Sequence, residues 1–289
     1  MRTEKEMFQL ILQIAKEDDR IRAVYMNGSR TNPNVEKDIF QDYDIVYVVK
    51  ETKTFIENKE WINQFGKRLY MQYPEDTDPE EHKEKCYGWL IQFEDGNRLD
   101  LHIHAEDYAK GDIVKDKLCT ILLDKDNILP EIPVSSDETH WVTKPTEDAF
   151  LYTCNEFWWC LNNVGKGLWR EEIPYVQDMV NMVLRPQLVK MLSWKIGITT
   201  NFSCSIGKSG KYMWKWLDEK EWKQFLRTYA GGNIEEIWDS TQQMCQLFHH
   251  TALFVSEKLQ FKYDKEEARA SYSFFLHTKK LPKDATEIM

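Results

Sequence analysis

Apolar residues along the first half of the chain recur with two different periods. Met7, Ile11 and Ala15 stand at helical spacing and predict an amphipathic helix over residues 4–18, and a second, shorter helix is expected over 54–65. Segments rich in β-branched and aromatic residues alternate with these helices. The predicted strands are 21–26, 43–49, 87–93 and 98–104. This mixture predicts the α+β class, with a mixed β-sheet flanked by helices.

The second half of the chain changes to a helical pattern. Residues 124–145 hold Pro130, Pro133 and Pro145 with little periodicity, as expected of a connection between domains. Thr146 then has the character of a helix N-cap. The predicted helices are 147–169, 172–197, 211–228 and 234–260. We therefore expect a catalytic domain over residues 1–135 and an α-helical bundle domain over residues 136–289.

Composition narrows the class of partner. Of 289 residues, 42% are hydrophobic and 30% charged, and the formal net charge is −10. This charge disfavours a polynucleotide partner and favours a cationic small molecule. The sequence shows neither an export signal nor an apolar stretch of about 18 residues, and its six cysteines are scattered. We expect a monomeric cytoplasmic protein with reduced thiols, no membrane span and no nucleic-acid partner.

The most informative chemistry is a pair of carboxylates at the start of a predicted strand. Asp42 and Asp44 stand two positions apart, so both point to one face of the sheet. Two adjacent carboxylates repel each other, and a divalent cation removes that repulsion. Oxygen ligands of this kind suit Mg²⁺, which also binds the phosphates of a substrate. An isolated pair of this spacing is, however, common on solvated turns.

A third carboxylate and a glycine–serine turn strengthen the metal-site interpretation. Asp100, His102 and His104 alternate with apolar residues on a second predicted strand and share its polar face. If that face meets Asp42 and Asp44, the three aspartates enclose a metal pocket, in which two ions about 4 Å apart could act on a phosphate. We expect the histidines to line the floor of this pocket or to hydrogen-bond a phosphate. A zinc site is the alternative, but two ligands from one strand are too few for it.

The segment Gly28-Ser29-Arg30-Thr31-Asn32, together with residues 40–45, resembles the DNA polymerase β-like nucleotidyltransferases. It is more closely similar to the aminoglycoside 6-adenylyltransferases, which modify streptomycin. The likeness runs nearly end to end. It includes residues 1–5, 19–22, 65–68, 74–76, 122–126, 154–158, 165–168, 183–185 and 205–208.

The resemblance implies transfer of AMP from ATP to a streptomycin hydroxyl, at position 6, with Mg²⁺ and release of pyrophosphate. It makes Asp42, Asp44 and Asp100 the metal ligands and Asp178 the base that accepts the hydroxyl proton. Two positions depart from the family pattern. Asn27 replaces the usual glutamate, and His102 and His104 replace a threonine- and leucine-rich strand end. Both positions lie beside the predicted active site.

Several further residues are candidates for binding the nucleotide. Gly28 lets the backbone approach a triphosphate, Ser29 offers a hydroxyl and an amide, and Arg30 belongs to the same motif. Other candidates are in the helical half. They are Lys166, Lys208 and Lys211, which could neutralise phosphate charge or simply be solvated lysines.

Two other features of the sequence leave alternatives open. In an ideal α-helix Asp178 and Arg185 would lie together, away from the apolar stripe, facing either a cleft or water. The acidic run from Glu75 to Glu81 is either a solvated loop or an attractor for the guanidinium groups of an aminoglycoside.

Three hypotheses for function follow. The first is an ATP- and Mg²⁺-dependent adenylyltransferase that acts on a cationic aminoglycoside and confers antibiotic resistance. The second is a nucleotidyltransferase with another small hydroxyl acceptor, such as a lincosamide. The third is a non-catalytic nucleotide-binding or toxin–antitoxin module. The presence of Asp42, Asp44 and Asp100 disfavours the third, because such a module would tolerate the loss of any of them.

Overall fold

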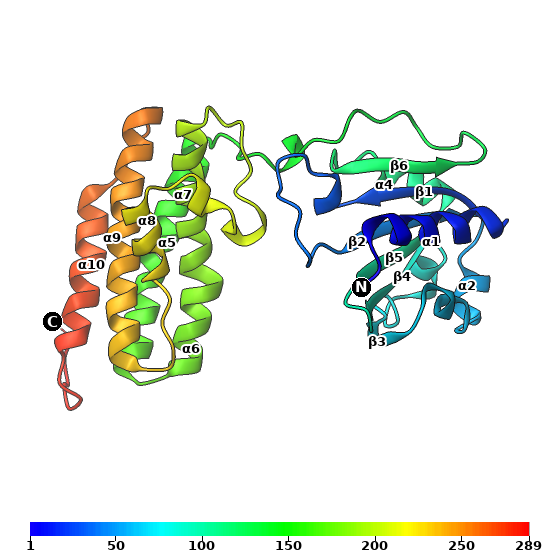
Figure 1. The fold of residues 1–289 in the computed structure, drawn as a ribbon. Coiled ribbons are helices and arrows are strands. Elements are labelled where there is room, and N and C mark those ends of the chain that lie inside the picture. The colour runs from blue at the N-terminus through cyan, green and yellow to red at the C-terminus, as the bar shows by residue number, and fades with distance from the viewer. Residues whose placement is uncertain (289) are drawn as a thin grey trace. The chain divides into compact units, whose positions relative to one another are not determined.

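The computed structural model describes residues 1–288 and divides the chain into two compact units (Figure 1). The first unit is Met1–Thr139, and the second begins at His140. The two units divide after residue 139, whereas the predicted domain boundary lies after residue 135.

The first unit is built on a six-stranded mixed sheet with the order β3-β4-β5-β2-β1-β6. Only β2 and β5 pair in parallel, and the other neighbours are antiparallel. The strands are β1 (Ile21–Asn27), β2 (Tyr43–Val49), β3 (Arg68–Gln72), β4 (Cys86–Phe93), β5 (Arg98–Ala105) and β6 (Cys119–Asp124). The helices are α1 (Glu4–Glu17), α2 (Lys53–Glu57), α3 (Glu80–Lys83) and α4 (Glu106–Asp112).

The two faces of the sheet differ in their covering. On one face, alternate residues of β2 and β5 pack in a core with Met7 and Ile11 of α1 and with Phe55 of α2. On the other face, Val46 and Val48 of β2 pack against α4. Period-two alternation places Asp42 and Asp44 on the same face as Val46 and Val48, at the beginning of β2. The acidic residues thus share a face with the α4 core but precede it along the strand.

The second unit is a bundle of helices around its own hydrophobic core. Its helices are α5 (Glu147–Trp169), α6 (Ile173–Asp178), α7 (Arg185–Thr199), α8 (Glu219–Leu226), α9 (Ile234–Leu259) and α10 (Lys265–Lys280), with a π-helix (Met179–Leu184) between α6 and α7. The Thr146 side chain accepts a hydrogen bond from the Ala149 amide, which confirms the predicted N-cap. The predicted α+β class, with a mixed sheet followed by a helical region, is confirmed.

Some predicted elements are wrong in extent. The helix expected over 54–65 is α2 followed by a 3₁₀ helix (Trp61–Phe65), and the helix expected over 211–228 begins only at Glu219, where Asp218 caps it. The edge strands β3 and β6 and the last helix, α10, are not among the predicted elements. All but one of the β3 side chains are exposed, so β3 has no apolar alternation from which to recognise it.

The predicted helix over 172–197 contains the π-helix, and this changes which residues share a face. Asp178 is exposed, whereas Arg185 is only 8% exposed and its guanidinium lies 3.6 Å from the Tyr229 ring centroid. In a π-helix each residue bonds five positions along the chain, so later side chains are rotated relative to an α-helix. The expectation that both residues lie away from the apolar stripe is therefore wrong for Arg185.

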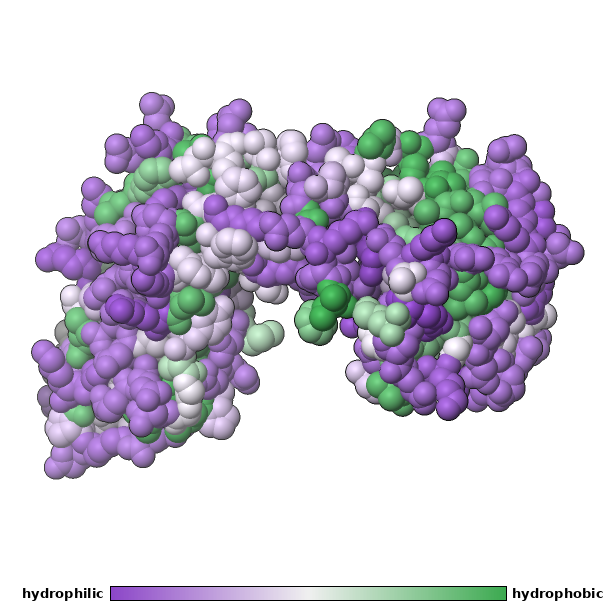
Figure 2. Space-filling model, in the orientation of Figure 1, coloured by the Kyte–Doolittle hydropathy of each residue, from purple (hydrophilic) through white to green (hydrophobic). Residues whose placement is uncertain are grey.

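On the face shown in Figure 2, hydrophilic residues cover most of the surface of both units, and hydrophobic residues form smaller separate patches. Among residues 1–288, no helix combines the length and apolar character needed to cross a bilayer.

Candidate active site

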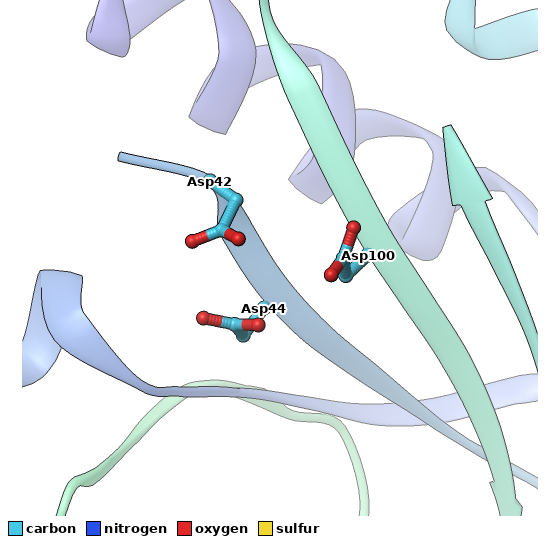
Figure 3. Close-up of side chains that lie close together, drawn as sticks. All are labelled: Asp42, Asp44 and Asp100. Carbon is cyan, nitrogen blue, oxygen red and sulfur yellow. The ribbon is translucent and has the colours of Figure 1, made fainter. Parts of the chain in front are cut away.

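Three aspartates from two neighbouring strands converge at one edge of the sheet (Figure 3). Because β2 and β5 pair in parallel, with Asp44 in register with Asp100, their side chains start from adjacent positions. Asp42 joins them from two positions earlier on the same face. One carboxylate oxygen of each residue lies within 4.8 Å of the others, and all three side chains are partly buried. The predicted spatial meeting of the three aspartates is thus observed.

The electrostatics of this acidic triad, Asp42, Asp44 and Asp100, favour a bound positive charge. Burial, followed by the charges of Asp42 and Asp100, raises the pKa of Asp44 to about 7. Ionisation of Asp44 is therefore costly unless a bound cation compensates the charge. Three carboxylates in close contact are the hard oxygen ligands that divalent cations such as Mg²⁺ prefer. The donor set therefore fits a divalent metal ion.

Gly28 is required by the close approach of its backbone to the triad. It follows β1 with φ 78° and ψ −157°, a backbone conformation available essentially to glycine alone. A β-carbon at this position would lie 2.1 Å from Asp44 Oδ2. Ser29 follows in a 3₁₀ helix (Ser29–Thr31) and is partly exposed. The turn therefore packs directly on the carboxylate of Asp44.

Arg30 holds the chain in place where β2 begins. Its Nε donates to the Asp42 carbonyl oxygen at 2.8 Å and its Nη2 to the Gln41 carbonyl oxygen at 2.7 Å. The guanidinium also lies 3.7 Å from the ring centroid of Tyr43, and the side chain is only 8% exposed. These contacts position the backbone of Asp42. Direct binding of the nucleotide by Arg30 stays a prediction.

Arg98 is a residue of the site that the sequence analysis missed. It lies on β5, two positions before Asp100, and donates to both oxygens of that carboxylate, at 2.8 and 2.6 Å. Its Nε also lies 3.7 Å from Asp42 Oδ2. The signal was present in the sequence, because the same alternation that selected Asp100 places Arg98 on the same strand face.

The two histidines continue this face of β5 away from the triad. Nε2 of His102 lies 3.7 Å from Glu75 Oε1, and Gly88 on β4 leaves room for the His102 ring. His104 is 5% exposed, and its Nδ1 lies 2.9 Å from the Tyr25 hydroxyl. Burial lowers the pKa of His104 to about 4, partly offset by the charge of Asp112.

These contacts bear on the zinc alternative and on the acidic run. Among residues 1–288, the acidic triad is the one group of three or more histidine, cysteine or acidic residues whose ligand atoms lie close enough together to hold a metal ion. The structure therefore does not support a zinc site at the histidines. Glu75 accepts a hydrogen bond from the Gly88 amide, and Asp76 accepts one from the Tyr87 hydroxyl. The start of the acidic run is therefore anchored to β4 rather than freely solvated.

The other predicted site residues belong to the second unit. Asp178 ends α6, immediately before the π-helix, and its side chain is exposed. Lys166 is exposed in the last turn of α5. Lys208 and Lys211 are exposed in one short segment, and Lys211 Nζ lies 5.0 Å from the Tyr212 ring centroid. Their assigned roles stay predictions.

A mixed sheet that brings three aspartates together beside a glycine–serine turn defines the class of a metal-dependent nucleotidyltransferase. Comparison with known proteins agrees. Residues 1–278 match the family described as streptomycin adenylyltransferase. The chain belongs to this family, and it is an enzyme of the nucleotidyltransferase class.

Three curated relatives are named aminoglycoside 6-adenylyltransferase. The protein from Bacillus subtilis (strain 168) is 40% identical over 94% of this chain and 97% of its own length. Those from Campylobacter jejuni and Staphylococcus aureus are each 36% identical, over 94% and 89% of this chain and 94% and 92% of their own lengths. A crystal structure of an aminoglycoside 6-adenyltransferase from Bacillus subtilis is 34% identical, covers 97% of this chain and 100% of that chain, and has a TM-score of 0.48.

Proposed function

We propose that this protein transfers AMP from ATP to a hydroxyl group of an aminoglycoside, the 6-hydroxyl of streptomycin, and so confers resistance to the antibiotic. The observation that carries this proposal is the acidic triad, present in a chain whose relatives over almost its whole length are named aminoglycoside 6-adenylyltransferase. The net charge of −10 is also favourable to a cationic acceptor.

Asp42, Asp44 and Asp100 are the residues that would hold the metal, which we take to be two Mg²⁺ ions. When bound, these cations would neutralise charge on the triphosphate and orient it. The Gly28 turn leaves space for Asp44, and Arg30 fixes the position of Asp42. The backbone of this turn would lie close to the phosphates of a bound nucleotide. Ser29, Lys166, Lys208 and Lys211 are the other proposed contacts to the nucleotide.

The transfer itself is a displacement at the α-phosphorus of ATP. The acceptor hydroxyl oxygen forms a bond to this phosphorus, the bond to the bridging oxygen of the β-phosphate breaks, and pyrophosphate leaves. The proton of the hydroxyl goes to a base, and the family resemblance assigns that role to Asp178. An exposed carboxylate suits this work if the hydroxyl comes within about 3 Å.

The test is product analysis with a panel of acceptors. The purified protein is incubated with Mg²⁺, ATP and streptomycin, other aminoglycosides or a lincosamide, and mass spectrometry and a pyrophosphate assay follow the reaction. We expect streptomycin to gain the mass of one AMP with one pyrophosphate released. Asp44→Asn should abolish this product, whereas Asp126→Asn, which changes an aspartate paired with Arg22 away from the triad, should not.

The panel also separates the alternatives. If only the lincosamide is modified, the acceptor is another small hydroxyl compound and not an aminoglycoside. Binding of ATP without modification of any acceptor would favour the non-catalytic hypothesis and overturn the proposal.

A further inference from the structure

The guanidinium of Arg98 and a bound metal ion would need the same carboxylate. Arg98 donates one hydrogen bond to each oxygen of Asp100, from Nε at 2.8 Å and from Nη2 at 2.6 Å. This is the two-point geometry in which arginine binds a carboxylate most strongly. The proposed function makes the Asp100 carboxylate a ligand of a divalent cation. Arg98 and the cation are therefore competitors for Asp100.

The competition extends beyond Asp100, because Arg98 also lies within ion-pair distance of Asp42. Its Nε is 3.7 Å from Asp42 Oδ2, so the guanidinium contacts two of the three carboxylates. A guanidinium and a divalent cation held by the same carboxylates would repel each other. Binding of the cation therefore favours movement of the guanidinium away from Asp100.

Arg98 is free to make such a movement. Its side chain is 47% exposed, whereas that of its partner Asp100 is 13% exposed. The guanidinium therefore reaches the site from the solvent side at the start of β5, and leaving the pair does not open the core. A phosphate group is the other ligand that matches the planar two-point geometry of arginine. The triphosphate of ATP would bring phosphate groups to this place.

We propose that Arg98 couples metal binding to nucleotide binding. Arg98 competes with the cation for Asp100. When the cation binds that carboxylate, Arg98 binds the phosphate chain of the nucleotide. Arg98 thereby weakens binding of the metal alone and strengthens binding of the nucleotide together with the metal. This inference rests on the proposed function, since it needs the triad to be a metal site.

A purely structural role for the Arg98–Asp100 pair is the competing explanation, and the chain offers a matched control for it. Arg22 on β1 makes the same two-point pair with Asp126, from Nε at 2.6 Å and from Nη2 at 2.5 Å. The Arg22 pair lies on the same sheet but involves no triad residue. Arg22→Ala therefore removes an equivalent ion pair without changing the proposed competition.

The first measurement uses Mn²⁺ alone, titrated into the full-length protein and followed by electron paramagnetic resonance. We expect Arg98→Ala to bind Mn²⁺ about fivefold more tightly than the wild type, the scale of one partly exposed ion pair. Arg22→Ala should bind Mn²⁺ as the wild type does. Asp44→Asn should lose the site.

The second measurement is the affinity for a non-hydrolysable ATP analogue at saturating Mn²⁺. Arg98→Ala should bind this analogue about tenfold more weakly than the wild type, because one charge-assisted pair to phosphate is lost. Arg98→Lys, which keeps the charge without the two-point geometry, should recover part of the loss. Arg22→Ala should again match the wild type.

The outcomes separate the inference from the function on which it rests. If Asp44→Asn and the wild type bind Mn²⁺ equally, or the wild type does not bind it, the metal site and the proposed function both fail. If Mn²⁺ binding depends on Asp44 but Arg98→Ala behaves as Arg22→Ala in either measurement, the coupling role of Arg98 is overturned while the metal site stands.

Discussion

Replacement of Gly28 by alanine tests whether the turn after β1 exists to make room for Asp44. Gly28 has φ 78° and ψ −157°, and a β-carbon there would lie 2.1 Å from Asp44 Oδ2 and 2.9 Å from its Cγ. The substitution therefore has two separate effects. It strains the backbone of the turn, and it forces the Asp44 carboxylate to move.

The structure gives a scale for each effect. Alanine in this glycine-specific region costs about 1–3 kcal/mol of folding free energy. Ordinary contact with a β-carbon begins at 3.4 Å, so the Asp44 oxygen must retreat by more than 1 Å. A displacement of about 1 Å within a catalytic site can lower the rate about 100-fold. We therefore expect a loss of turnover far larger than the loss of stability would explain.

Gly96 provides the matched control. It has φ +88° in the turn between β4 and β5, and a β-carbon there meets nothing within 4 Å. Urea unfolding should show that Gly28→Ala and Gly96→Ala each lose about 1–3 kcal/mol of stability. The pyrophosphate assay should show a loss of about 100-fold in kcat for Gly28→Ala alone. Comparable turnover of the two variants would refute the argument that Gly28 sets the position of Asp44.

Three further predictions concern other residues. Arg30→Ala should lower the free energy of unfolding in urea by about 2 kcal/mol, because hydrogen bonds from a buried guanidinium to two carbonyl groups disappear. Its kcat should also fall, because Asp42 shifts. Wild-type stability and kcat would contradict this. Asp178→Asn should bind ATP normally in calorimetry yet lose turnover, and unchanged turnover would remove Asp178 as the base. For His104, the folded-state pKa of about 4 lies below the ordinary 6.5, so the unfolded state binds more protons between these values. The free energy of unfolding should therefore fall by about 3 kcal/mol as the pH drops through this window, and His104→Gln should lose that dependence. If the wild type and His104→Gln show equal pH profiles in urea unfolding, His104 is not the source of the dependence.

Periodicity in the sequence was sufficient to predict the strands of the site and the faces of their residues. Alternation put Asp42 and Asp44 on one face of β2 and Asp100 on the polar face of β5, and the structure brings the three side chains together. What periodicity could not supply is the register, which pairs Asp44 with Asp100, more than fifty positions further along the chain. Register between distant strands is set by packing of the whole sheet, so no local pattern contains it.

The two arginines and the π-helix show other limits of the sequence. Arg98 was predictable as a neighbour of Asp100 by the same alternation, but its pairing with that residue depends on side-chain conformation. Arg30 donates hydrogen bonds to backbone carbonyl oxygens. Every residue has such an oxygen, so the residue types along the sequence do not indicate this contact. Whether a segment forms an α- or a π-helix after Asp178 depends on how it packs in the bundle, and an ideal helical wheel therefore placed Arg185 on the wrong face.

The most direct test of the central claim, that the three aspartates hold the catalytic metal, is anomalous diffraction from crystals containing Mn²⁺ and a non-hydrolysable ATP analogue. We predict manganese peaks ligated by oxygens of Asp42, Asp44 and Asp100, together with phosphate oxygens, and loss of those peaks in Asp44→Asn. Bound nucleotide without manganese at the triad, or manganese that leaves Asp100 uncoordinated, would contradict the account.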